Sequence, residues 1–147
     1  MISETLTWVA HDEPSRAAAL VVDAGLEAAN AAAAPLSDVQ PLACFAHAAS
    51  GNVIAGAVGR TWGACGELQQ LWVEPEVRRN GIASRLVRMF EERATARGCR
   101  VFYLETFSFQ APAFYRKLGY HSALELRGFP SGIVKYVMIK KLGAEVD

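Results

Sequence analysis

The sequence predicts an α/β (α+β) fold: a mixed, mostly antiparallel sheet of about six to seven strands with flanking helices. The first observation is a run of strand-like stretches joined by short turns, which predicts an antiparallel meander over residues 41–49, 53–61 and 67–73. The second is a helical stretch between this meander and a further strand over residues 100–106. Such a crossover places its two flanking strands parallel. The third is a closing pair of strands over residues 119–126 and 133–141.

The first forty residues predict a strand followed by a helix. Residues 5–10 largely alternate, with Leu6, Trp8 and Ala10 on one face, as in a half-buried strand. Pro14 suits the first turn of a helix. The buried side of that helix is predicted to carry apolar residues: Leu20, Val21, Ala24, Ala28 and Ala31. Gly25 could divide the helix in two, and residues 36–40 form a loop.

Turns and one long helix connect the remaining strands. Residues 50–52 and 62–66 carry turn signals. Between residues 82 and 97, apolar side chains recur at three- and four-residue spacing, which predicts an amphipathic helix with this buried face: Ile82, Leu86, Met89, Phe90 and Ala94. Gly98 is a helix stop signal. A short helix is expected over about residues 110–118, and a loop over residues 127–132.

Composition predicts one globular domain over residues 1–147. Hydrophobic residues make up 52% of the chain and charged residues 20%, which favours a packed core over disorder. The 15 basic and 15 acidic residues balance, which argues against a general nucleic-acid binder. No apolar run approaches the ~20 residues of a membrane span. Three scattered histidines and three cysteines without ligand spacing predict no metal site and a reducing cytoplasmic environment.

The loop before the long helix carries the clearest chemical signal. A helix N-terminus offers free backbone N–H groups and the positive end of the helix dipole, so it attracts anions such as phosphate. Gly81 removes a Cβ where a ligand would approach closely, and Arg78 and Arg79 add positive charge. These features favour a pyrophosphate cradle, although a solvated basic loop has the same residue types.

Two motifs together resemble the GNAT N-acetyltransferase superfamily. The first is Arg78-x-x-Gly81-x-Ala83, directly after a strand, and it resembles the acetyl-CoA loop of that family. The second is the segment over residues 111–120, Ala-Pro-Ala-Phe-Tyr-Arg-Lys-Leu-Gly-Tyr, which is similar to the family's A-x-x-F-Y-x-x-x-G-F/Y helix. The resemblance is sharp over residues 67–120. It implies acetyl-CoA as cosubstrate, and a splay between strands four and five, over residues 67–73 and 100–106.

The resemblance implies three cofactor-binding segments. Backbone groups of Leu71 and Val73, with Trp72 between them, are expected along the pantetheine arm, because unpaired strand groups need partners. The loop contributes Arg78, Arg79, Asn80, Gly81, Ile82, Ala83 and Ser84. The third segment contributes Ser108, Gln110 and Tyr115. Many members carry Asn at the position of Ser108. Here Ser108 or Gln110 could replace it as a hydrogen-bond donor to the cofactor, or these side chains could serve only to cap the start of the helix.

The resemblance also points to catalytic residues. Tyr115 matches a Tyr near the sulfur and is the candidate general acid; its alternative role is packing. Glu67 is the candidate base, with Glu105 as runner-up, and Gln69 and Gln70 could instead order a water chain.

These residues predict an acetyl-CoA-dependent N-acetyltransferase. The acetyl group would pass directly to a primary amine in a ternary complex, and the acceptor is a small molecule or a peptide. The alternatives are transfer of another acyl group and a non-catalytic acyl-CoA sensor. No metal, nucleic-acid or membrane partner is expected. Apolar residues 136–139 predict a strand edge through which the chain forms a homodimer.

Overall fold

The computed structural model describes residues 5–143, which divide into two compact units on either side of residue 36. The N-terminal unit contains one helix, α1 (Arg16–Ala33), whose first turn is capped where the Ala18 N–H donates to Ser15 Oγ at 3.3 Å. The helix runs unbroken through Gly25, so the predicted division is wrong. The high helix propensity of the alanines on both sides offsets the low propensity of one glycine.

Two further predictions for this unit are wrong. Residues 5–10 form no strand, because their extended backbone pairs with no ladder among the described residues, and an apolar alternation alone supplies no hydrogen bonds. Within its own unit the predicted buried side of α1 packs against nothing, since the helix contains no buried residue.

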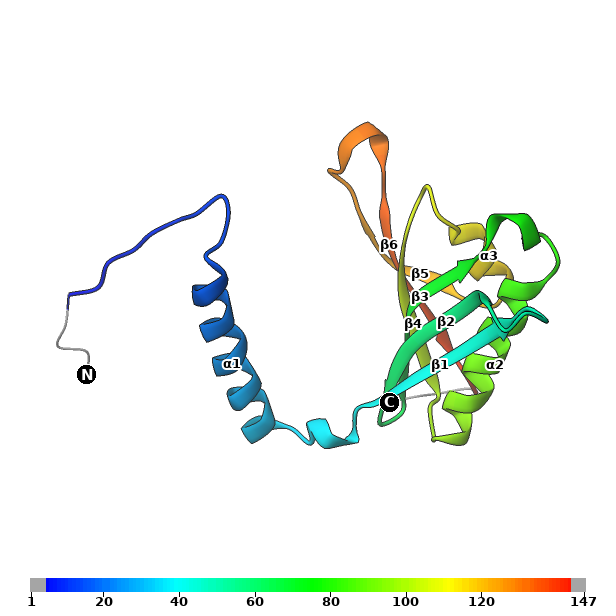
Figure 1. Ribbon diagram of the computed structural model, residues 1–147, viewed down its shortest axis with the longest axis horizontal. Coiled ribbons are helices and arrows are strands. Elements are labelled where there is room, and N and C mark those ends of the chain that lie inside the picture. The colour runs from blue at the N-terminus through cyan, green and yellow to red at the C-terminus, as the bar shows by residue number, and fades with distance from the viewer. Residues whose placement is uncertain (1–4, 144–147) are drawn as a thin grey trace. The chain divides into compact units, whose positions relative to one another are not determined.

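The second unit is built on a six-stranded sheet of order β1-β2-β3-β4-β6-β5, in which only β3 and β4 run parallel (Figure 1). Its strands are β1 (Gln40–His47), β2 (Val53–Trp62), β3 (Cys65–Val73), β4 (Val101–Phe107), β5 (His121–Leu126) and β6 (Lys135–Lys141). Its helices are α2 (Ile82–Ala96) and α3 (Pro112–Lys117), and single 3-10 turns occur at Leu36–Asp38, Pro75–Val77 and Pro130–Gly132. The predicted mixed sheet is therefore confirmed, with every strand end within two residues of its expected place.

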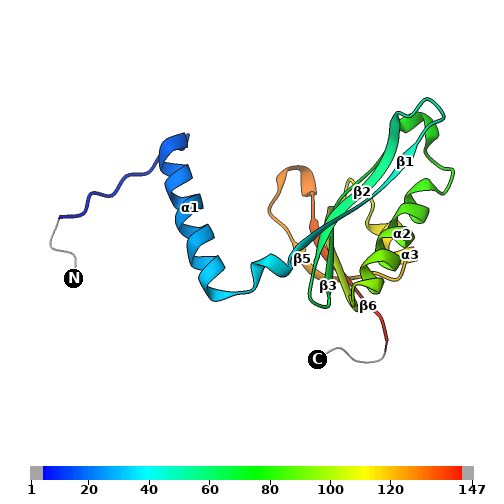
Figure 2. The same ribbon diagram turned by 60° about the horizontal axis from the view of Figure 1, so that its bottom comes forward.

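The core of this unit lies between the sheet and its helices. Both α2 and α3 lie on the same side of the sheet (Figure 2). The predicted apolar face of α2 is largely confirmed, because Leu86, Phe90 and Ala94 are fully buried; Met89, in contrast, is exposed. The three buried residues of α2 pack in one cluster with inward residues of the strands: Leu42, Ala55, Ala57, Leu68, Phe102, Leu104 and Met138. No helix among residues 5–143 is long and apolar enough to span a bilayer.

A β-bulge in β3 lies where this strand begins to separate from β4. Across the β2–β3 pair, Val58 lies opposite Gln70 but Gly59 lies opposite Leu68, so Gln69 is the extra residue. A bulge bends its strand and increases the local twist. Pairing of β3 with β4 ends at Leu68 and Leu104, although both strands continue. The predicted splay between these strands is thus confirmed, and it begins at the bulge.

Candidate active site

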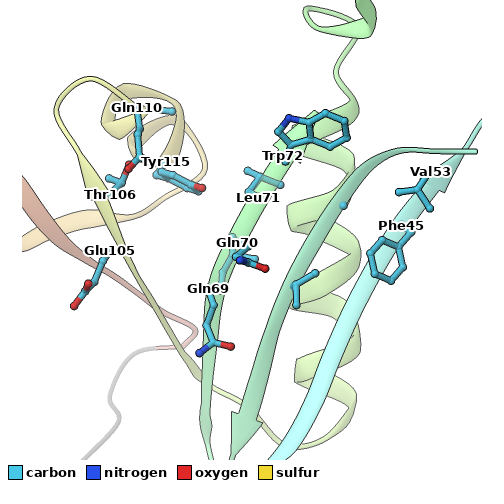
Figure 3. A pocket seen from close by; sticks show the side chains of 14 residues that line it. Phe45, Val53, Gln69, Gln70, Leu71, Trp72, Glu105, Thr106, Gln110 and Tyr115 are labelled. Carbon is cyan, nitrogen blue, oxygen red and sulfur yellow. The ribbon is translucent and has the colours of Figure 1, made fainter. Parts of the chain in front are cut away.

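Two adjoining cavities meet at the splayed end of β3. The β3–β4 cavity, about 560 Å³, is lined by Phe45, Val53, Gly56, Val58, Leu68, Gln69, Gln70, Leu71, Trp72, Glu105, Thr106, Gln110, Ala111 and Tyr115 (Figure 3). The loop groove, about 700 Å³, is lined by Leu71, Trp72, Val73, Arg78, Arg79, Gly81, Ile82, Ala83, Ser84, Phe109, Gln110, Ala111 and Phe114. Four residues line both: Leu71, Trp72, Gln110 and Ala111. A ligand can therefore extend from the groove into the cavity along β3.

The loop groove has the geometry of an anion site. Gly81 caps α2 with a left-handed backbone (φ +74°) and without any side-chain capping bond. A Cβ at Gly81 would meet nothing within 4 Å, so the space above the loop is open. The first N–H groups of α2 have no carbonyl one turn earlier and point out of the helix end. A phosphate group fits this arrangement of free donors and helix dipole.

Side chains of the loop hold it in shape. Arg78 Nε donates to the Val73 carbonyl at 2.8 Å, which ties the loop to the end of β3. Asn80 Nδ2 donates to the carbonyls of Val77 (3.0 Å) and Arg78 (3.3 Å), and it does not line the groove. Arg79 lines the groove, and its backbone has a left-handed φ of +67°. Arg78, in contrast, is held by its bond to Val73. Arg79 is therefore freer than Arg78 to pair with an anion.

Tyr115 projects from α3 into the β3–β4 cavity, toward Leu71 on the facing strand (Figure 3). Its residue is only 8% exposed, and its ring packs edge-on against Phe114 (5.1 Å between centroids) and Tyr120 (5.8 Å). Among the described residues its hydroxyl has no hydrogen-bond partner. Burial raises the pKa of Tyr115 to about 12. The side chain is thus a neutral proton donor at physiological pH.

Glu67 lies outside this cavity. It stands on the paired part of β3, where Glu67 Oε2 accepts from Arg60 Nε at 3.0 Å and from the Tyr103 hydroxyl at 2.9 Å. Burial, followed by the hydrogen bond to Glu67, raises the pKa of Tyr103 to about 12. The structure does not bring Glu67 and Tyr115 into one cavity, because Glu67 precedes the bulge and the splay begins after it.

Four other predicted polar residues line one or both cavities. Glu105, Gln69 and Gln70 line the β3–β4 cavity, and the Glu105 carboxylate pairs with Lys135 Nζ at 2.9 Å. Gln110 lines both cavities while its Oε1 accepts from the Phe107 N–H at 2.7 Å and from Thr106 Oγ1 at 3.3 Å.

Ser108 lines neither cavity. Its Oγ accepts from the Val134 N–H at 3.0 Å, and its own N–H donates to the Val134 carbonyl at 2.8 Å. Of the two candidates for the family's Asn, only Gln110 is placed to reach a ligand in either cavity.

Sequence reasoning missed the wall of the cavity formed by β1 and β2. Phe45, Gly56 and Val58 line it from strands that carry no family motif. Their signal in the sequence was strand alternation alone, which places them on the face opposite the buried residues of the same strands. No group of three His, Cys, Asp or Glu side chains with metal-site geometry occurs among residues 5–143.

The chain matches the Acetyltransferase (GNAT) family model over residues 6–120. It therefore belongs to the GNAT acetyltransferase family, and it is an acetyltransferase enzyme. Acetyl-CoA is the acyl donor of this family.

Individual relatives agree with this assignment. The chain is 34% identical over 112 residues to blasticidin-S acetyltransferase from Streptomyces morookaense, covering 74% of this chain and 82% of that protein. A solved structure from Agrobacterium tumefaciens is similar with a TM-score of 0.80 and 27% identity, covering 93% of this chain and all of that one. An acetyltransferase structure from Bacillus cereus is similar with a TM-score of 0.76 and 25% identity, covering 91% and 98%.

Proposed function

We propose that this enzyme acetylates a primary amine of a small molecule, of the kind found on amine-bearing antibiotics, by direct transfer from acetyl-CoA in a ternary complex. The observation that carries the proposal is the meeting of the two cavities beside Leu71 and Trp72, with Tyr115 lining the β3–β4 cavity and pointing toward Leu71. One cavity has room for the acceptor while the groove holds the donor. The similarity to blasticidin-S acetyltransferase supports the antibiotic-like acceptor class.

The groove residues divide the work of holding the donor. Backbone N–H groups at the start of α2 and the Arg79 guanidinium suit the pyrophosphate. Beyond Leu68, the edge of β3 that faces β4 has no strand partner, so the N–H and C=O of Leu71 and the N–H of Val73 are available to the pantetheine amides. The Val73 carbonyl already accepts from Arg78 Nε. Acetyl-CoA supplies the activated acetyl thioester when it is bound.

Tyr115 serves as the general acid. When the amine nitrogen bonds to the acetyl carbon and the carbon–sulfur bond breaks, the electron pair of that bond leaves on sulfur. Tyr115 donates its hydroxyl proton to this sulfur and recovers a proton after release. None of the three cysteines lines either cavity, which supports direct transfer without a cysteine-bound acetyl group.

The amine must lose one proton to balance the one that sulfur gains. Glu105, or water held by Gln69 and Gln70, is better placed than Glu67 to accept this proton, because all three residues line the β3–β4 cavity. Glu67 is held by Arg60 and Tyr103, so a role for it requires relay through water. The same cavity also has room for an acyl group larger than acetyl, which remains the second candidate donor.

Arg79→Ala is expected to weaken acetyl-CoA binding by roughly 10-fold, because a charge-assisted bond to the pyrophosphate is lost. Affinity for acetyl-pantetheine, which lacks the pyrophosphate, should stay near the wild-type value. Thermal shift measures both, since ligand at ~100 times its Kd stabilises by roughly 2.7 kcal/mol. Arg88→Ala, which removes the same charge on α2 outside the groove, is the control. Equal weakening of both ligands by Arg79→Ala would show that the loop does not hold the pyrophosphate.

We also propose a homodimer, with one correction to the predicted surface. Residues 136–139 belong to β6, which is paired on both sides, so they form no sheet edge; the edge strand next to β6 is β5. Leu124 and Leu126 of β5 are exposed, and they pair across the strands with Val137 and Lys135 of β6. Light scattering at high protein concentration is expected to give twice the chain mass, and a particle of 15.9 kDa would reject the dimer.

A further inference from the structure

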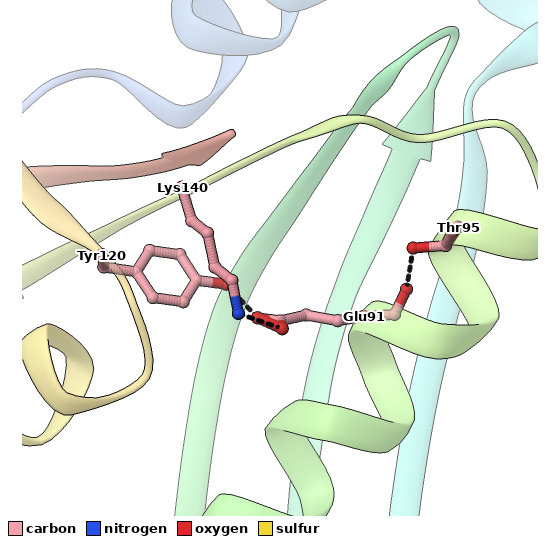
Figure 4. A network of polar contacts seen from close by, with 4 residues as sticks. All are labelled: Glu91, Thr95, Tyr120 and Lys140. Atoms are coloured by element: carbon pink, nitrogen blue, oxygen red, sulfur yellow. Dashed lines mark hydrogen bonds and ion pairs between the residues drawn. The ribbon is translucent and has the colours of Figure 1, made fainter. Parts of the chain in front are cut away.

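A buried polar cluster lies behind Tyr115, on the helix side of the sheet. Glu91 of α2 accepts two hydrogen bonds: from the Tyr120 hydroxyl at 2.9 Å through Oε2, and from Lys140 Nζ at 2.8 Å through Oε1 (Figure 4). Tyr120 is 4% exposed and Glu91 is 9% exposed. Lys140 Nζ also lies 5.7 Å from the Tyr120 ring centre. The Tyr120 side chain is therefore fixed to α2 directly and to β6 through Glu91.

The same Tyr120 is joined to Tyr115 in two ways. The Tyr120 N–H donates to the Tyr115 carbonyl at 3.1 Å, across a turn at Gly119 whose φ is +99°. The two rings meet edge-on at 73° with 5.8 Å between centroids. Because α3 has only six residues, it has little stability of its own and depends on such contacts for its position.

A gain in stability alone is a weak explanation for this cluster. Burying an ion pair costs desolvation, and well-packed apolar side chains of the same volume often stabilise a fold equally well or better. A polar tether does something that apolar packing does not, since a hydrogen bond fixes distance and direction. Proton transfer to sulfur requires such a fixed position, because a donor must come within hydrogen-bond reach of its acceptor.

We propose that Tyr120 is a positioning residue for Tyr115, anchored by the Glu91 carboxylate. The hydrogen bond from Tyr120 to Glu91 holds the end of α3 and the edge of the Tyr115 ring, so that the Tyr115 hydroxyl stays at the junction of the two cavities. Lys140 balances the charge of the anchor. This inference rests on the acid role proposed for Tyr115.

Tyr120→Phe removes the tether and keeps the ring contact. The single-turnover rate of acetyl transfer is expected to fall roughly 10-fold, because a displacement near 1 Å costs up to ~10²-fold. Acetyl-CoA affinity, measured by calorimetry, should not change, since Tyr120 lines neither cavity. The acetyl acceptor in this assay is blasticidin S. If blasticidin S is not acetylated, concentrated methylamine is used as the acceptor. Tyr136→Phe, which removes a hydroxyl from a half-buried tyrosine of β6, should leave the rate unchanged.

A double-mutant cycle separates positioning from a general loss of packing. In a Tyr115→Phe background, Tyr120→Phe should cause no further loss, because no hydroxyl remains to be positioned. An equal loss in both backgrounds would overturn the inference while leaving the acid role of Tyr115 intact. A Tyr115→Phe variant with the full wild-type rate would remove the acid role, and the inference with it.

A second pair of variants serves if Tyr120→Phe does not fold. Glu91→Gln with Lys140→Met keeps an oxygen that accepts from Tyr120, whereas Glu91→Met with Lys140→Met removes it. Both replace the ion pair with neutral side chains. The inference expects a near-wild-type rate for the first variant and the roughly 10-fold loss for the second. Equal rates in the two folded variants would overturn it.

Discussion

Tyr115→Phe is expected to lower kcat by roughly 10–100-fold while acetyl-CoA affinity changes little. The substitution removes one hydroxyl and keeps the ring contacts with Phe114 and Tyr120. The lost interaction matters only as charge develops on sulfur, so the loss falls on the rate and not on binding. Positioned acids contribute ~10²–10⁴-fold, but a thiolate with a pKa near ~8.5 is already a fair leaving group, so the low end is expected.

The deficit should be the same at every pH between 6 and 9. Burial raises the pKa of Tyr115 to about 12, so the hydroxyl stays protonated throughout that window and begins to lose its proton only well above it. Single-turnover measurements across pH 6–9 check this without interference from slow product release. A variant whose single-turnover rate equals that of the wild type at each pH would leave Tyr115 a packing residue.

Gly59→Ala is expected to lower the free energy of unfolding by about 3 kcal/mol, the upper part of the range for overpacking. A Cβ at Gly59 would lie 1.9 Å from the Glu67 carbonyl oxygen and 2.9 Å from Phe90 Cζ, and the first of these is backbone that cannot swing away. The strain falls on the bulge from which the splay begins. Thermal unfolding should show a melting temperature about 10 °C lower.

Gly25→Ala is the matched control for this stability prediction. Gly25 lies within α1, where an added Cβ meets nothing within 4 Å. Alanine favours helix over glycine by about 1 kcal/mol, so this variant should be no less stable than the wild type. A Gly59→Ala protein that melts at the wild-type temperature would contradict the close approach of β2 and β3 at the bulge.

The strands of the second unit were predictable because their signals are local. Alternating side chains and turn residues such as Gly51 and Asn52 act within a few residues, and the strand ends follow from them. Residues 5–10 carry the same alternation and form no strand, because a strand also needs a partner for its backbone groups. Whether such a partner strand is available depends on the whole fold, and residues 5–10 alone do not indicate it.

The candidate site was predictable only in part, for a related reason. Gly81 and Tyr115 lie in contiguous motifs; Gly81 lines the loop groove and Tyr115 lines the β3–β4 cavity. The position of Glu67 depends on strand register: Arg60 lies directly opposite it on β2 and Tyr103 on β4, and the bulge at Gln69 comes just after it. A single extra residue in one strand leaves no clear trace in the sequence, so the separation of Glu67 from the cavity could not be foreseen.

We propose above all that this chain transfers acetyl from acetyl-CoA to a small-molecule amine. The most direct test incubates the full chain with acetyl-CoA and a panel of amines: blasticidin S, other amine antibiotics, polyamines and lysine peptides. Free thiol and the mass of each acceptor are followed together. We expect one thiol released for each acetyl group gained by a small-molecule amine, and a strong reduction of both in Tyr115→Phe. Tight acetyl-CoA binding without acetylation of any amine class would contradict it and favour a non-catalytic acyl-CoA sensor.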